Sequence, residues 1–269
     1  QFSLPLFCSN LLQQVYNLTD TALTGHLLGS AALAEIGATA ALYGLIMNFA
    51  FGMNNGLALT VSRCFGAGER EGIRRAVGWM VTLSAAVSIV LTTVSLLGRG
   101  ALLQVLQVPA EVWDGAAAYL TVILLGIPLT MLYNMEAALL RAVGNSVTPL
   151  LFLLFSSVLN VGLDAAFMGP LGMGVRGAAV ATVLAQGISA VLGAVYLVRS
   201  YPELHFAPAH LKKSARRAVM NMFWAGMSMG LMSAIYNLGS VALQSSINAL
   251  GSVYITAQTA ARRMAEMYF

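Results

Sequence analysis

Three carboxylates fall inside stretches of the chain that are otherwise apolar. Asp20, Glu136 and Asp164 each lie within such a stretch, and about 20 apolar residues are enough for a helix to span a bilayer. A charged side chain at the bilayer centre costs about 2.5 to 3.5 kcal/mol on insertion scales, so an acid there is a functional candidate. In this setting a carboxylate could bind and release a proton or a small cation.

Polar residues accompany two of these acids at helical spacing. Side chains three and four residues apart lie on one face of a helix, so the polar positions form stripes that face other helices. Asn160 and Asp164 are four apart, close enough for one cation to contact both. Three stripes predict a hydrated interior: Asn10, Gln13, Asn17, Asp20 and Thr24; Ser156, Asn160 and Asp164; and Ala178, Thr182, Gln186 and Ser189.

The residue types favour a proton or Na⁺ without choosing between them. Carboxylate, amide and hydroxyl oxygens are the hard ligands that Na⁺ requires, and an acid beside another acid suits proton binding. The alternative for Asp20 and Asp164 is that they serve only as hydrogen-bonding links between helices. For Glu136, about one turn before Arg141, we expect a structural role as a snorkelling or paired acid.

The composition requires a bilayer. Hydrophobic residues make up 58% of the chain and charged residues 9%, whereas soluble domains carry about 25% charged residues. We therefore predict an all-α integral membrane protein of about eight transmembrane helices, the last incomplete. The spans are placed at Leu4–Leu28, Ile36–Ser62, Ala76–Leu97, Ala116–Leu140, Pro149–Met168, Val175–Val198, Val219–Ile247 and from Val253 onward.

The basic residues predict the orientation. Arginines concentrate between Arg63 and Arg75, and basic residues again between Arg199 and Arg217, so these loops and the N-terminus are expected to be cytoplasmic. The net charge of +4 comes from such loops rather than from a nucleic-acid surface. His205 and His210 fall in a predicted loop and His26 at the loop end of the first span, so no catalytic constellation at membrane depth is apparent and an enzyme is not expected.

An internal repeat predicts two halves. Residues 16–23 align with residues 236–243, six spans later, and an even separation makes the repeat parallel. We predict an N-lobe of six helices over 1–198, a cytoplasmic inter-lobe loop over 199–217, and the start of a C-lobe over 218–269. Since the chain opens at Gln1 and stops at Phe269 within a predicted helix, we expect it to be a piece of a longer transporter.

Several motifs in order along the chain resemble one family, the multidrug and toxic compound extrusion (MATE) transporters, and specifically their DinF-like prokaryotic branch. The motifs are Leu4-Pro5-Leu6 through Gln14-Val15-Tyr16-Asn17-Leu18-Thr19-Asp20, Arg63-Cys64-Phe65-Gly66-Ala67-Gly68, Leu140-Arg141-Ala142-Val143-Gly144-Asn145-Ser146-Val147-Thr148-Pro149, Ser156-Ser157-Val158-Leu159-Asn160-Val161-Gly162-Leu163-Asp164 and Gly172-Met173-Gly174-Val175-Arg176-Gly177-Ala178-Ala179.

The resemblance implies a fold of two parallel six-helix lobes and an antiporter that exports organic, often cationic, compounds in exchange for H⁺ or Na⁺ by alternating access. It implies a cation-coupling site, and a site for Na⁺ if that is the ion, at Asp20, Asn160, Asp164 and Thr182. The supporting cavity residues that it implies are Tyr16, Asn17, Tyr119 and Asn134. The repeat partner of Asp20 is Ser240, and the seventh span contains no carboxylate, so coupling is expected in the N-lobe.

The resemblance also predicts the cellular location, the oligomeric state and the partners. We expect a multi-pass protein of a bacterial or archaeal plasma membrane, monomeric when full length, with small organic substrates, no nucleic-acid partner and no cofactor besides the coupling ion. A lipid-linked oligosaccharide flippase of the same broad superfamily is the alternative. A more basic central cavity would be expected of it, whereas the first seven spans contain almost no Lys or Arg.

Overall fold

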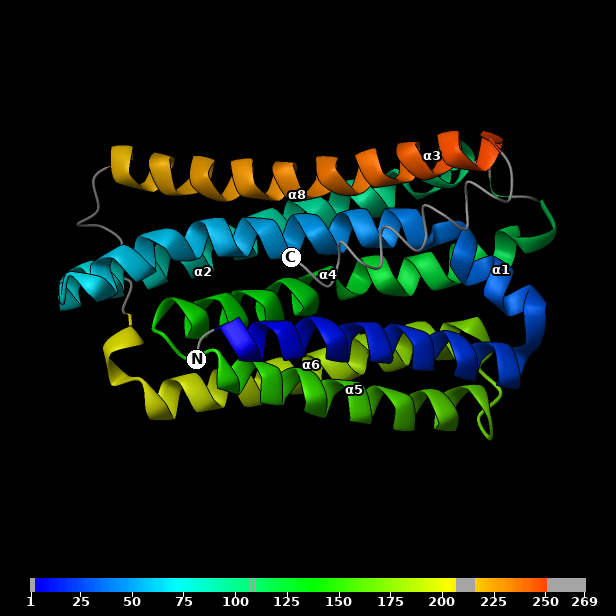
Figure 1. Ribbon diagram of the computed structural model, residues 1–269, viewed down its shortest axis with the longest axis horizontal. Coiled ribbons are helices and arrows are strands. Elements are labelled where there is room, and N and C mark those ends of the chain that lie inside the picture. Colours follow the sequence, from blue (N-terminus) through cyan, green and yellow to red (C-terminus); the bar gives the residue numbers. More distant parts are fainter. Residues whose placement is uncertain (1–2, 107, 109, 207–215, 251–269) are drawn as a thin grey trace.

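The computed structural model describes residues 3–106, 108, 110–206 and 216–250, and over these residues the chain forms helices and no strand (Figure 1). Five helices are long and apolar enough to cross a membrane, or six if one bent pair within α1 counts as a span. This confirms an all-α membrane fold. The elements are α1 (Ser3–Gly66), α2 (Arg70–Leu97), α3 (Arg99–Val105), η1 (Ala110–Val112), α4 (Trp113–Ala142), α5 (Val147–Met168), α6 (Val175–Ser200), η2 (Pro202–Leu204) and α8 (Arg216–Leu250).

The first helix holds the first two predicted spans. In Figure 1 its dark-blue first half and its lighter-blue second half run in opposite directions. The reversal starts at Gly29, whose φ of 82° and ψ of −174° are non-helical and lie in a region that glycine adopts readily. A second bend of 45° separates Ala32–Ala40 from Leu42–Gly66. The predicted loop between the two spans is thus helical on both sides of Gly29, because this segment is rich in Ala and Leu, which favour helix.

The other boundaries differ from the predicted spans by a few residues. The largest difference is at α2, which begins at Arg70 rather than Ala76 and so takes basic residues of the predicted loop into its first turns. Charged residues can continue a helix beyond the apolar layer, where hydropathy alone no longer marks it. The predicted eighth span, from Val253, lies outside the described residues.

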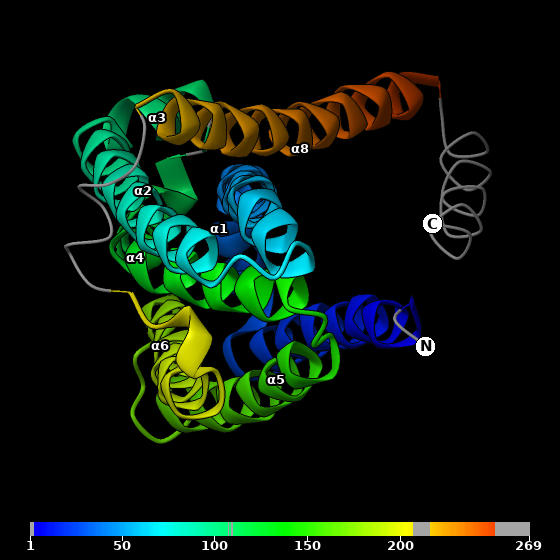
Figure 2. The same cartoon turned by 90° about the vertical axis from the view of Figure 1, so that its left-hand side faces the viewer.

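Two helices, α4 and α6, are the most buried of the five candidate spans. Half of the most apolar window of α4 and of α6 is buried within the protein, against 17% for α2 and 22% for α5. Viewed end-on in Figure 2, α4 lies inside the bundle, with α5 and α6 on one side and α8 on the other. The exposed faces of α2 and α5 carry large apolar side chains such as Val94 and Val158, as lipid contact requires.

The end of α4 is fixed by a glycine. Gly144 has a φ of 86°, and the following Asn145 N–H donates to the Leu140 carbonyl at 2.9 Å. This six-to-one bond closes a helix at a left-handed residue. The Asn145 side chain then accepts from the Thr148 N–H at 3.0 Å in the first turn of α5. A short turn therefore brings α5 back alongside the bundle.

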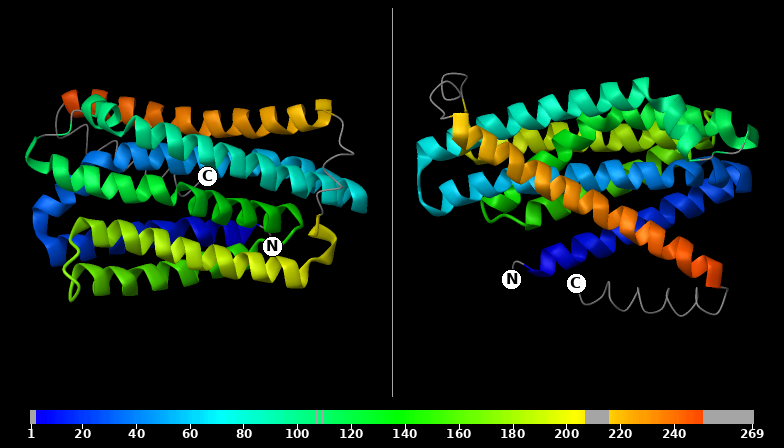
Figure 3. Two further views of the ribbon diagram at one scale, coloured as in Figure 1. Left: turned by 180° about the vertical axis from the view of Figure 1, so that it is seen from behind. Right: turned by 90° about the horizontal axis from the view of Figure 1, so that it is seen from above.

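Glycines let α1 and α8 cross closely. Gly52 and Gly56 on α1 face α8, where Gly226 and Gly230 occupy the same four-residue spacing. A Cβ atom at residue 56 would lie 2.5 Å from the Ala225 carbonyl oxygen and 2.7 Å from the Gly226 Cα. Small residues at this spacing allow close backbone approach between membrane helices. The right panel of Figure 3 shows α8 running obliquely across the other helices.

A buried asparagine ties three helices together. Asn54 on α1 is fully buried; its amide nitrogen donates to the Ala50 carbonyl at 2.9 Å and to the Met131 carbonyl of α4 at 3.4 Å. The Ser84 hydroxyl of α2 donates to its oxygen at 3.0 Å. Asn54 therefore fixes the positions of α1, α2 and α4 relative to one another.

Replacing Asn54 with leucine is expected to destabilise the protein by about 1 kcal/mol, since interhelical hydrogen bonds in membranes are worth about 0.6 to 1.7 kcal/mol. The change would also leave the buried Ser84 hydroxyl without its acceptor. The measurement is thermal unfolding in detergent. Asn48→Leu is the matched control, because Asn48 is exposed and, among the described residues, bonds only to the Gly44 carbonyl of its own helix. Equal melting temperatures for the two variants would contradict the structural role of Asn54.

Candidate functional site

The structure brings Asp20 of α1 and Asp164 of α5 together. Their carboxyl groups are hydrogen-bonded to each other. Asp164 has no exposed surface, while Asp20 is partly buried. Nearby, the Thr24 hydroxyl of α1 contacts the Met168 sulfur of α5 at 3.8 Å, so the two helices are packed together along this stretch. Acids 144 positions apart in sequence are neighbours because α1 and α5 pack side by side.

Asn160 links the acid pair to α6. It lies one turn before Asp164 and is 1% exposed. In the orientation that satisfies both ends of its amide, its nitrogen donates to Asp164 Oδ2 at 2.8 Å and its oxygen accepts from the Thr182 backbone N–H at 3.1 Å. The Thr182 hydroxyl lies 3.4 Å from the same amide and donates to the Ala178 carbonyl at 3.0 Å. The structure thus assembles the four predicted coupling-site residues from three helices.

The geometry of this group suits a proton or a single small cation. Two carboxyl groups cannot hydrogen-bond to each other unless a proton lies between them, and two like charges at this separation would repel. The Oδ1 atom of each acid is buried and has no hydrogen-bond partner among the described residues. Such oxygens are free to accept a proton or to ligate a cation. Within the described residues no three His, Cys, Asp or Glu side chains gather as a metal cluster.

Tyr119 of α4 is buried near the site. It is 6% exposed and packs in an apolar cluster with Ile123, Met168 and residues of α6. It lies close enough to interact electrostatically with both Asp20 and Asp164. The predicted supporting position at Tyr119 therefore lies near the acid pair.

A hydrogen-bonded group that the sequence left unassigned continues from the site. The side chains of Tyr43 and Gln186 are hydrogen-bonded, and Tyr43 interacts electrostatically with Asp20. The Thr130 hydroxyl of α4 donates to Gln186 Oε1 at 2.5 Å. The signal for Gln186 was its place on the polar stripe of α6, one turn after Thr182. Tyr43 had no such signal, because a tyrosine in an apolar span resembles an interfacial anchor.

Three supporting positions are not brought to the acid pair by the described contacts. Tyr16 and Asn17 belong to α1, but their side chains lie outside those that the structure describes. Asn134 is 15 residues beyond Tyr119 on α4, about 22 Å along the helix. Its amide donates to the Thr130 carbonyl of its own helix at 2.9 Å. Any role of Asn134 would be exercised away from Asp20 and Asp164.

The structure overturns the expectation for Glu136. Its side chain is 4% exposed, so it does not reach toward the membrane surface. Arg141 contacts residues of α1 instead of Glu136. Its guanidinium donates to Asn55 Oδ1 at 3.1 Å and lies 5.5 Å from the Phe51 ring centroid. Five residues correspond to about 500° around a helix, which places the two side chains about 140° apart. Helical geometry therefore separates Glu136 from Arg141.

Comparison with known proteins agrees with this fold. The sequence model of the MatE family matches residues 5–166. "Probable multidrug resistance protein YpnP" of Bacillus subtilis is 28% identical over 98% of this chain and 58% of its own length. "Probable multidrug resistance protein NorM" of Thermotoga maritima is 29% identical over 71% of this chain and 42% of its own length. The chain thus spans about half the length of these relatives, 58% of one and 42% of the other.

A solved structure has the same fold. A MOP superfamily transporter from Pyrococcus furiosus, described as having a binding pocket of reverse polarity that suggests a different function, superposes with a TM-score of 0.85 at 25% identity. The match covers 99% of this chain and 59% of that one. With the family model matching more than half of the residues, the chain belongs to the MatE family of membrane transporters.

Proposed function

We propose that this chain forms the N-lobe and the start of the C-lobe of a secondary antiporter that exports organic, often cationic, compounds in exchange for H⁺ or Na⁺. The observation that carries the proposal is the hydrogen-bonded pair Asp20 and Asp164, buried between membrane helices. Support also comes from the relatives, which are named as multidrug resistance proteins. Buried acids of this kind are costly in a bilayer and typical of ion pathways.

The proposed cycle uses the charge of the pair. With both acids ionised, repulsion and burial favour a conformation in which water or a cationic substrate neutralises them. Binding of the coupling ion removes this requirement, and the first half of α1 can then pack more closely against α5. An ion shifts the balance between two conformations only as far as its affinities for them differ. Asp20 lies where α1 meets α5, so its affinity for the ion would differ between the two conformations.

Asn160 and Thr182 would set the position of the acid pair. The Asn160 amide spans the gap between Asp164 and the α6 backbone, so the separation of α5 and α6 governs the geometry of the site. In the case of Na⁺, the carboxylate, amide and hydroxyl oxygens supply hard ligands. In the case of H⁺, the same amide orients the carboxyl group that receives the proton.

The proposed lobes and orientation follow from the same elements. Residues 1–198 would form the N-lobe, residues 199–217 the cytoplasmic connection, and residues 218–269 the start of the C-lobe. Basic residues between Arg63 and Arg75 and near Arg216 would face the cytoplasm of a bacterial or archaeal cell. The N-terminus would then be cytoplasmic, with Asp20 and Asp164 in the outer half of the membrane.

The proposal is tested by reconstituting the product of the complete gene in liposomes and measuring ethidium transport under an imposed H⁺ or Na⁺ gradient. We expect transport against an ethidium gradient with one of the two ions and none after the corresponding ionophore is added. The ion that drives transport is the coupling ion. Absence of transport with both gradients, together with movement of a lipid-linked oligosaccharide, would replace the antiporter by a flippase.

A further inference from the structure

A third acid lies buried away from the acid pair. Glu136 of α4 is 4% exposed, and within the described residues no hydrogen bond reaches its carboxyl group. It lies six residues before the end of α4. Asp164, by contrast, is 17 residues from the start of α5, about 26 Å along that helix. Because a short turn joins α4 to α5, Glu136 and Asp164 lie toward opposite faces of the membrane.

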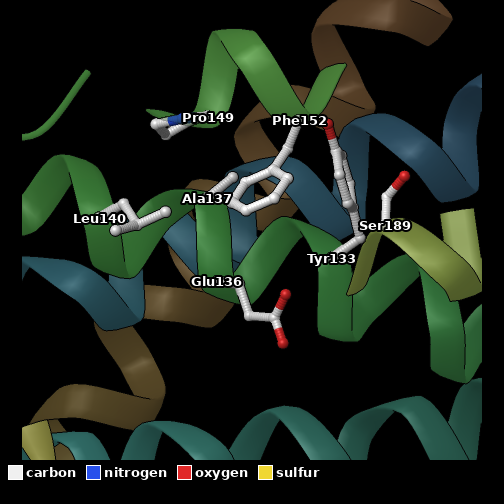
Figure 4. A pocket seen from close by; sticks show the side chains of 7 residues that line it. All are labelled: Tyr133, Glu136, Ala137, Leu140, Pro149, Phe152 and Ser189. Atoms are coloured by element: carbon white, nitrogen blue, oxygen red, sulfur yellow. The ribbon is translucent and has the colours of Figure 1, made fainter. Parts of the chain in front are cut away.

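A buried hydroxyl and a small cavity adjoin this acid. Ser189 of α6 is 1% exposed, and its Oγ is buried with no hydrogen-bond partner in the described part of the chain. Figure 4 shows Glu136 and Tyr133 on α4, Phe152 and Pro149 of α5 above them, and Ser189 to one side. These residues line a cavity of about 10 Å³. That is about the space required by one water molecule, far below the roughly 300 Å³ of a drug pocket.

The backbone of α6 approaches the acid closely. A Cβ atom at Gly193 would overlap Glu136 Oε2, so only glycine leaves room for the carboxyl group at this point. Among the described residues the titratable group that interacts electrostatically with Glu136 is Tyr133, also on α4, whereas Arg141 interacts with Tyr133 and not with Glu136. Pro149 and Phe152 of α5 contribute none. The carboxyl group therefore belongs to a buried side chain and has neither a cationic partner nor a hydrogen-bond donor in the part of the chain that the structure describes.

Polar residues of α6 lie between the two acid sites. Thr182, Gln186, Ser189 and Gly193 follow one another on α6 at spacings of four, three and four, so they share one face. Thr182 belongs to the acid-pair site, and Ser189 lies about 10 Å further along the helix. Gln186 lies between them, hydrogen-bonded to Tyr43 and to Thr130. Hydroxyl and amide groups thus extend from Asp20 and Asp164 toward Glu136.

We propose that Glu136 and Ser189, with one water molecule between them, form a second proton-binding site through which a proton from the acid pair leaves the N-lobe. The proton lost by the acid pair protonates the Glu136 carboxylate and is then released to water at the cytoplasmic side. The inference rests on the proposed antiport function with H⁺ as the coupling ion. A site of this size admits a proton carrier and excludes the organic substrate.

The test compares Glu136→Gln with wild type in liposomes, using the full-length protein and ethidium. Net transport driven by a pH gradient is expected to fall about tenfold or more, since a positioned proton-transfer group raises the rate of its step by at least that factor. Exchange of labelled for unlabelled ethidium at equal pH should fall far less, because it needs no net proton release. Glu136→Asp should restore part of the net transport. Glu111→Gln, at an exposed acid in η1, makes the same chemical change and should behave as wild type.

A second measurement reads protonation directly. The infrared difference spectrum between high and low pH should contain a protonated-carboxyl band that Glu136→Gln removes and Glu111→Gln retains. Gly193→Ala, which displaces the carboxyl group, should shift that band. Three outcomes would overturn the proposal. The first is that Glu136→Gln retains the band, the second is that this variant transports normally, and the third is that it loses net transport and exchange in parallel. Wild-type transport driven only by Na⁺ would overturn it while leaving the antiport function standing; no wild-type transport at all would refute the antiport function itself.

Discussion

Asp164→Asn is expected to lower gradient-driven ethidium export by about a hundredfold or more. A loss of this size matches the rate contribution of a positioned proton-transfer group. The amide has nearly the shape of the acid, so the packing of α5 against α1 should survive. It cannot take up or release a proton, and it removes the charge that a cation would neutralise. Asp20→Asn should have the same direction of effect, because the two carboxyl groups share one hydrogen bond.

The measurement is export from an efflux-deficient cell that expresses the complete gene, with membrane content checked for each variant. Asp114→Asn is the matched control, since Asp114 is an exposed acid in the first turn of α4. The double variant Asp20→Asn with Asp164→Asn should be little worse than either single variant, because residues that act as a unit are not additive. Unchanged export in the single variants would leave the acids as interhelical links only.

Gly56→Leu is expected to produce the largest loss of stability. A side chain at this position meets the backbone of α8 at Ala225 and Gly226, and backbone atoms cannot move aside as a flexible side chain can. Overpacking typically costs about 1 to 3 kcal/mol, and separating two helices also loses the contacts on both sides of the crossing. We expect a melting temperature several degrees lower and less folded protein in the membrane.

The change is measured by thermal unfolding in detergent, with Gly162→Leu as the control. Gly162 lies on the exposed face of α5, and nothing lies within 4 Å of a Cβ atom placed there. In a helix, leucine is favoured over glycine by about 0.8 kcal/mol or more, so the control should be neutral or slightly stabilising. If Gly56→Leu were as stable as this control, the close crossing of α1 and α8 would not contribute to the fold.

Much of this fold could be predicted because the bilayer leaves few alternatives. Apolar stretches of about 20 residues must become helices in lipid, and the described helices that correspond to predicted spans agree with them within a few residues, apart from the earlier start of α2. The i and i+4 spacing of Asn160 and Asp164 depends on one helix alone, so their common face was also predictable. The helical segment around Gly29 was not, because hydropathy marks the membrane boundary rather than the backbone turn.

The sequence by itself determined an all-helical membrane protein and which acids are costly enough to matter, since both follow from residue type and local periodicity. Tertiary structure decided what those acids contact. Packing of α1 against α5 joined Asp20 to Asp164, and packing of α4 against α6 enclosed Glu136 with Ser189 and Gly193. Asn54 and the glycines of α1 and α8 likewise acquired their roles from neighbours distant in sequence. The spacing of residues along one helix cannot specify which other helix will face it.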